Sequence, residues 1–173
     1  MDLSYPIGKF DRETPITLEM RADWIDVLAA APAAFRDAVR GWNDRQLDTP
    51  YRPGGWTVRR LIHHVADSHM NSYIRFRLAL TEESPVIKPY DQEKWAELID
   101  ARSMPIEPSL AVIEGMHARW VVLLRDFSAR EFDRTFVHPE AGILRLDQAL
   151  GLYAWHSRHH CAHIIGLRRR EGW

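Results

Sequence analysis

The sequence has very little cysteine, which excludes a disulfide framework. Cys161 is the single cysteine among 173 residues, so no internal disulfide can form, and this fits a reducing compartment. No basic segment followed by an apolar run opens the chain, and no apolar stretch approaches membrane-spanning length. We therefore expect a cytoplasmic protein with no membrane partner.

Neither sign of charge is in excess. The 23 basic and 24 acidic side chains leave a formal net charge of -1, whereas a dedicated nucleic-acid binder normally has a basic surplus. The one basic cluster, residues 168–170, ends a predicted helix, where cations interact favourably with the helix dipole. We expect no nucleic-acid partner.

Motifs for phosphate binding and nucleophilic catalysis are also lacking. The pair Gly54-Gly55 is followed by neither a P-loop nor a dinucleotide-binding pattern, so we interpret it as a turn. No nucleophile elbow and no paired-cysteine zinc motif occurs. A catalytic or binding site must therefore be built from other residues.

Hydrophobic periodicity predicts a single all-α domain over residues 1–173. Hydrophobic residues make up 46% and charged residues 27% of the chain, a balance typical of globular proteins. Four long helical patterns begin near Thr17, Thr57, Pro108 and Asp147. We expect Asp147 to cap the last helix at its start and Gly172 to end it. The predicted fold is a four-helix bundle.

The segments between these helices carry structure of their own. Capping boxes at Asn43 and Ser128 predict two short helical turns, and a third short helix is expected from Gln92 to Ile99. Residues 135–146 break at a proline and a glycine and suit a small hairpin. Pro32 should kink or divide the first helix. Such long, structured connections argue against a simple up-down bundle with tight loops.

The histidines are the most informative feature of the chain. Four of the nine fall within eight residues, 156–163, on the last helix, and a second group, His63, His64 and His69, lies on the second long helix. Imidazoles on a buried helix face need partners, and one metal ion can satisfy several at once. The alternative is that these rings are hydrogen-bonded core residues.

Helix geometry narrows the ligand choice without settling it. Histidines four residues apart can bind one ion, and His156 with His160 and His159 with His163 both have this spacing. The helical wheel slightly favours the first pair. A catalytic centre typically takes three protein ligands, and the third would be His63 or His64, of which His64 fits the inward stripe better.

Other polar residues have weaker claims to a role in such a site. Asp67 could accept a hydrogen bond from a ligand imidazole, or it could be a surface carboxylate paired with Arg60 or Arg75. His117 and His138 stand alone in their segments and are interpreted as structural or surface residues. Cys161 is expected to be a small buried residue and not a ligand. Candidate pocket walls are Tyr73, Tyr90, Trp95 and Trp155.

Residues 54–59 (GGWTVR), 63–71 (HHVADSHMN) and 155–160 (WHSRHH) together resemble the DinB/YfiT-like superfamily. The resemblance is closest to the YfiT-type metal-dependent hydrolases, also discussed as bacillithiol S-transferases. It extends over nearly the whole chain, including residues 5–8 and 88–91. It implies a four-helix bundle in which three histidines hold a nickel or zinc ion, and by position these are His64, His156 and His160. It also implies a cytoplasmic homodimer.

An open three-histidine site predicts a metal-dependent enzyme of one of two kinds. The ion could activate water for hydrolysis, or a low-molecular-weight thiol for transfer to an electrophile. Family resemblance slightly favours thiol transfer. The alternative function is a non-catalytic metal-binding protein, structural or sensory, and the participation of His159 and His163 stays open.

Overall fold

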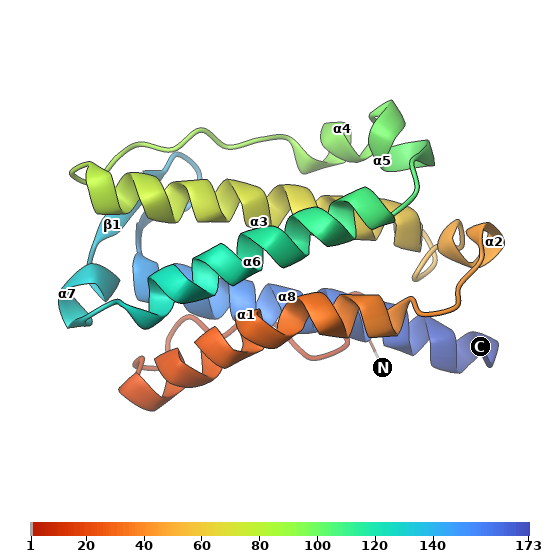
Figure 1. Ribbon diagram of the computed structural model, residues 1–173, viewed down its shortest axis with the longest axis horizontal. Coiled ribbons are helices and arrows are strands. Elements are labelled where there is room, and N and C mark those ends of the chain that lie inside the picture. Colours follow the sequence, from red (N-terminus) through yellow and green to blue (C-terminus); the bar gives the residue numbers. More distant parts are fainter. Residues whose placement is uncertain (1) are drawn as a thin grey trace.

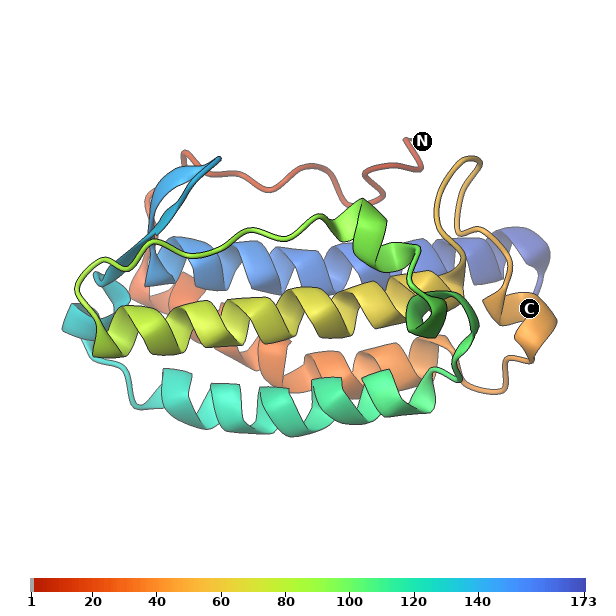
Figure 2. The same ribbon diagram turned by 90° about the horizontal axis from the view of Figure 1, so that it is seen from above.

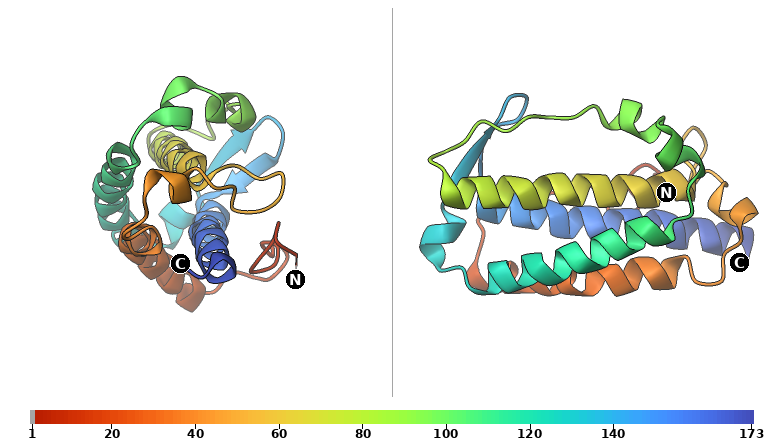
Figure 3. Two further views of the ribbon diagram at one scale, coloured as in Figure 1. Left: turned by 90° about the vertical axis from the view of Figure 1, so that its right-hand side faces the viewer. Right: turned by 45° about the horizontal axis from the view of Figure 1, so that its top comes forward.

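Four long helices form the body of the protein in a computed structural model that describes residues 2–173 (Figure 1). They are α1 (Leu18–Ala38), α3 (Val58–Thr81), α6 (Glu107–Arg125) and α8 (Leu146–Glu171). Helix α1 packs against α6 and α8, and α3 packs against the same two helices, so the ring order is α1, α6, α3, α8 (Figure 3). The predicted all-α four-helix bundle is confirmed.

The connection between α3 and α6 gives the bundle its topology. Helices α1 and α8 run in one direction, and α3 and α6 run in the other (Figure 1). Two consecutive helices can be parallel here because the chain returns along the whole length of α3 before α6 begins (Figure 2). The returning segment contains α4 (Gln92–Ala96) and α5 (Ile99–Ser103). The single short helix expected from Gln92 to Ile99 is thus two, separated by the extended backbone of Leu98.

Helix starts follow local side-chain chemistry. The hydroxyls of Thr17 and Thr57 accept hydrogen bonds from backbone amides in the first turns of α1 and α3. The predicted capping boxes at Asn43 and Ser128 are both present and open α2 (Asp44–Leu47) and α7 (Ala129–Phe132). Pro32 lies inside α1 without dividing it.

The start of α8 differs from the prediction. Asp147 is not the cap: the helix begins at Leu146 with Arg145 in the cap position, and Asp147 is fully buried in the first turn. Its carboxylate accepts hydrogen bonds from Arg21 of α1 at 2.7 Å and from Arg145 at 3.0 Å. The carboxylate is used for this ion pair between helices, which is a tertiary contact that local sequence does not reveal.

The predicted hairpin precedes α8. Strands β1 (Thr135–His138) and β2 (Gly142–Arg145) pair antiparallel, and the amide of Ile87 donates to the carbonyl of Val137 at 3.0 Å. The returning segment is therefore attached to the hairpin. Among the described helices, none is long and apolar enough to cross a membrane.

A layer of histidines separates two apolar clusters inside the bundle. One cluster includes Leu61, Ile113 and Ile164, and the other includes Phe76 and Trp120. On α8, His156, His159 and His160 lie between the residues of the two clusters, and on α3 His69 does, whereas His117 of α6 directly follows Met116 of the second cluster. Polar rings from three helices thus meet near the junction of the two apolar clusters.

The N-terminal arm lies along the outside of α8 (Figure 2). The indole N–H of Trp155 donates to the carbonyl of Gly8 at 3.1 Å, and the Tyr5 ring lies 5.9 Å from that of His159. The arm therefore covers the part of α8 that carries the histidine cluster.

Candidate metal centre

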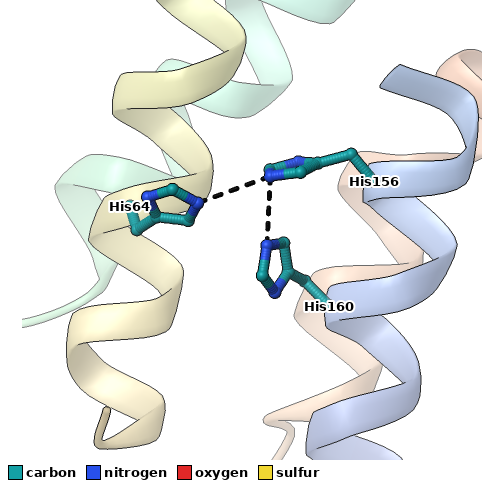
Figure 4. A group of neighbouring side chains, drawn as sticks. All are labelled: His64, His156 and His160. Atoms are coloured by element: carbon teal, nitrogen blue, oxygen red, sulfur yellow. Dashed lines mark hydrogen bonds between the residues drawn. The ribbon is translucent and has the colours of Figure 1, made fainter. Parts of the chain in front are cut away.

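Three imidazole rings from two helices point toward one another (Figure 4). His64 comes from α3, while His156 and His160 lie one turn apart on α8. The Nε2 atom of His156 is 3.4 Å from Nε2 of His64 and 3.0 Å from Nε2 of His160. These are the three histidines that the wheel and the family resemblance selected, and the fold brings their ring nitrogens together.

These separations fit a common ion. Two nitrogens about 2.1 Å from one metal, at angles between those of octahedral and tetrahedral geometry, are about 3.0 to 3.4 Å apart. A ligand atom from each of the three rings lies within 4.8 Å of the other two. The arrangement therefore fits three ligands that share one divalent cation.

Burial keeps the rings in the protonation state that metal binding needs. It lowers the pKa of His64 to about 4 and holds the pKa values of His156 and His160 well below the ordinary range. A neutral imidazole has a lone pair for an ion, whereas an imidazolium has none. The site is therefore ready for a cation at neutral pH.

A second group, His159, His160 and His163, also has ligand atoms within 4.8 Å of one another. It shares His160 with the first group, so the two sets overlap and are not independent sites. Aromatic rings stack on its other members: Trp155 on His159 at 4.4 Å between centroids, and Tyr51 on His163 at 4.2 Å. This packing makes His159 and His163 part of the wall beside the three-histidine centre.

The three-histidine centre opens into a pocket of about 370 Å³. The N-terminal arm, the loop before α3 and the last helix build its walls. Of the predicted wall residues only Trp155 lines it; Tyr90 lines a neighbouring pocket with Ser68, Trp95 packs on Tyr90, and Tyr73 packs on Trp120. The side chains beside the histidines belong to Ser4, Tyr5, Tyr51, Arg52, Trp56, Gln92, Glu93 and Trp155.

The acceptor beside His156 is a histidine and not the predicted Asp67. The Nδ1 atom of His156 is 2.9 Å from Nε2 of His69, and within residues 2–173 no hydrogen bond joins a histidine of the centre to the Asp67 carboxylate. Asp67 also does not pair with Arg60, which binds Glu97 at 2.6 Å. Burial, with the nearby charge of Asp100, raises the pKa of Asp67 to about 6.

Two buried histidines of this region make a contact that the sequence does not predict. The rings of His69 and His117 lie in contact, with Nδ1 of His69 2.9 Å from Nε2 of His117, and His117 has the structural role that was one of the two expected for it. Both are almost completely buried. Because they come from α3 and α6, only the packing of these helices shows that they meet.

The remaining candidates lie away from the centre. His63 bonds to the Ser109 hydroxyl of α6 at 2.7 Å, so His64 is the ring that faces α8. Cys161 is buried as expected, and burial raises the pKa of its thiol to about 12. His138 is on the hairpin, beside the neighbouring pocket.

Known proteins resemble this chain over its whole length. A "Putative metal-dependent hydrolase" of Bacillus cereus (strain 03BB102) is 54% identical over 172 residues, 99% of both chains, and one of Bacillus thuringiensis subsp. konkukian (strain 97-27) matches equally well. The solved structure of YfiT from Bacillus subtilis, described as a probable metal-dependent hydrolase with an unusual four-helix bundle topology, superposes with a TM-score of 0.96 at 52% identity. That match covers 100% of this chain and 99% of YfiT.

The family model of the DinB superfamily matches residues 27–164, which include all three histidines of the centre. The chain therefore belongs to the DinB superfamily.

Proposed function

We propose that this chain is a metal-dependent enzyme in which His64, His156 and His160 hold a divalent zinc or nickel ion. The observation that carries the proposal is the convergence of three neutral ring nitrogens at 3.0 and 3.4 Å on the floor of a pocket. Imidazole ligands suit either metal, so the ligand set leaves the choice between the two to measurement. Such an ion supplies Lewis acidity, which makes a water or a thiol more acidic and a better nucleophile at neutral pH.

The pocket supports a small-molecule substrate. Its volume of about 370 Å³ lies within the range of ligand pockets. Aromatic rings of Tyr5, Tyr51, Trp56 and Trp155 line the walls and can exclude water from one side of a bound molecule. Arg52 is the cationic side chain at the rim.

Hydrolysis is the activity that we propose first. Glu93 is the one carboxylate that lines this pocket in the described chain, and its Oε2 accepts the indole N–H of Trp56 at 3.2 Å. We propose that this carboxylate takes a proton from the attacking water. The names of the relatives as metal-dependent hydrolases support the same reaction class.

Thiol transfer differs from hydrolysis only in the nucleophile. A low-molecular-weight thiol that enters the pocket would replace water, and the soft sulfur suits zinc or nickel. This activity needs no protein base once the thiol is ionised. The Glu93 carboxylate is therefore the residue whose removal should separate the two reactions.

The test uses zinc- or nickel-loaded protein with two probes. We expect hydrolysis of p-nitrophenyl acetate without thiol, reduced about 100-fold or more by Glu93→Gln and abolished by His156→Ala. The second probe is 1-chloro-2,4-dinitrobenzene with and without cysteine. Product that forms only with cysteine and is insensitive to Glu93→Gln would replace hydrolysis by thiol transfer, and no turnover of either probe would favour a non-catalytic metal site.

A further inference from the structure

A chain of hydrogen bonds leads from the metal centre through the bundle to the backbone of α1. His156 Nδ1 lies 2.9 Å from His69 Nε2, and His69 Nδ1 lies 2.9 Å from His117 Nε2. His117 Nδ1 in turn lies 2.7 Å from the carbonyl oxygen of Leu28. Three imidazoles from three helices thus connect the Leu28 carbonyl to His156.

The Leu28 carbonyl at the far end of these hydrogen bonds is free to accept because of Pro32. In an α-helix the carbonyl of residue 28 would accept the amide of residue 32, but proline has no amide hydrogen. Leu28 and Pro32 both lie within the continuous helix α1. The Leu28 carbonyl is therefore left without its helical donor and accepts the His117 ring instead.

The Leu28 carbonyl fixes which ring nitrogen carries the proton in each of the three histidines. A carbonyl oxygen can only accept, so His117 must carry its proton on Nδ1 and present a bare Nε2. That Nε2 can only accept, so His69 must be protonated on Nδ1. The same step repeats at His156, which donates from Nδ1 and keeps the lone pair on Nε2.

The lone pair of His156 thereby points at the proposed metal position. Its Nε2 is the atom that faces Nε2 of both His64 and His160. A ligand imidazole whose second nitrogen donates to a fixed acceptor has its tautomer and its ring orientation set. The two inner rings are shielded from water, because His69 is 0% and His117 1% exposed.

We propose that His69 and His117 are positioning residues that, together with the carbonyl freed by Pro32, hold His156 in the tautomer and orientation that a metal ion requires. The proposal rests on the proposed function in that His156 is taken as a ligand. It assigns roles to buried histidines that contact neither the ion position nor the pocket. The rings act through hydrogen bonds to one another and do not change their charge.

Nitrogen-15 NMR of histidine-labelled, metal-free protein shows directly which nitrogen of each ring is protonated. We expect His117, His69 and His156 each to show a protonated Nδ1 and an unprotonated Nε2. A protonated Nε2 on His156 or on His69 would overturn the proposal. Because no metal or turnover is needed, this result stands apart from the outcome of the activity assays.

Substitutions test whether the hydrogen bonds between these histidines affect metal binding. Zn²⁺ affinity, measured by competition with a chromophoric chelator, should fall about 10- to 100-fold in His69→Phe, because His156 loses its acceptor. His69→Gln keeps a side-chain carbonyl and should retain more affinity than His69→Phe. His117→Phe should also weaken binding, since His69 loses the bond that fixes its proton.

The matched control is His63→Phe. His63 is a buried histidine on the same helix, next to His64, but it bonds to Ser109 and takes no part in the hydrogen bonds between His156, His69 and His117. Its substitution should leave Zn²⁺ affinity within about threefold of wild type, and thermal melting of the metal-free variants checks that each is folded. Equal loss in His63→Phe and His69→Phe, or none in His69→Phe, would contradict the positioning role.

Discussion

At the scale of single residues, burial decides which histidines stay neutral. His163 packs against Tyr51 beside the metal centre, and its pKa is lowered to about 4, first by burial and then by His159, Arg52 and Arg170, against an opposing backbone contact with Ser4. In the unfolded chain the same ring has a pKa near 6.5. The unfolded state therefore binds the proton first as the pH falls.

This difference predicts how His163 affects the stability of metal-free protein. Its depressed pKa costs nothing above about pH 6.5 and destabilises the fold increasingly as the pH falls toward 4. His163→Phe keeps an aromatic ring on Tyr51 and should stabilise the protein by about 1 to 2 kcal/mol more at pH 5 than at pH 8, after allowance for solvent screening. Urea unfolding at the two pH values measures it, and a gain that is equal at both would count against the account.

The effect of Asp67 on the pH dependence of stability has the opposite sign. Its pKa is raised to about 6 by burial and by Asp100, so the folded state binds the proton more tightly than the unfolded state. The contribution to stability is present below about pH 4 and is lost as the pH rises through 6. Asp67→Asn should therefore stabilise the protein by about 1 kcal/mol at pH 8 and by little at pH 4.

The measurement for Asp67 is the same pair of urea titrations. Asp126→Asn is a suitable control, because that carboxylate lies near the surface at the end of α6. Destabilisation of Asp67→Asn at pH 8 would mean that the carboxylate has a partner that favours its charged form.

The sequence was informative about those residues whose role depends on one helix. Spacing of one helical turn indicates two histidine pairs on α8, of which the helical wheel slightly favours His156 with His160, and the buried stripe of α3 favours His64. The roles of His69, His117 and Asp147 depend on which helix faces which, so local pattern could not predict them. Pro32 was expected to disturb its helix, and instead it leaves a carbonyl free for a neighbouring side chain.

At the scale of elements, one glycine determines how closely α8 can pack against α1. A Cβ atom added at Gly151 of α8 would lie 2.8 Å from the Trp24 ring of α1, whereas one added at Gly115 of α6 would meet nothing within 4 Å. The first glycine is therefore required by packing, and the second is not.

Alanine substitution at the two positions should have opposite effects. Gly151→Ala gains helix propensity but forces Trp24 or the helix to move, for a net destabilisation of about 1 to 3 kcal/mol. Gly115→Ala should stabilise by about 0.5 to 1 kcal/mol, because its site is open and exposed. Thermal melting measures both, and a gain of stability in Gly151→Ala would show that the α1–α8 contact is looser than described.

The order of the elements was easier to predict than their connections. Four amphipathic patterns of helical period predict four helices, and the capping boxes and the hairpin follow from local turn chemistry. The return of the chain along α3 and the division between α4 and α5 depend on contacts with the bundle. The returning segment also contacts the hairpin, where Ile87 bonds to Val137, and such contacts join residues far apart in sequence.

At the scale of the whole molecule, the two apolar clusters on either side of the histidine layer predict that the bundle folds without metal. Structural ions are needed for folding, whereas catalytic ions can be removed from a folded protein. Treatment with a chelator should lower the melting temperature, by the amount that binding of the ion contributes, and leave the helical circular dichroism unchanged at 25 °C. Loss of helical signal on chelation would instead assign the ion a structural role.

The most direct test of the central claim, that three histidines hold one ion, is elemental analysis of protein purified without a histidine tag. We expect about one zinc or nickel ion per wild-type chain, retained in His63→Ala and lost in His64→Ala and His156→Ala. A wild-type protein without stoichiometric metal, or a His64→Ala variant that retains it in full, would contradict the claim.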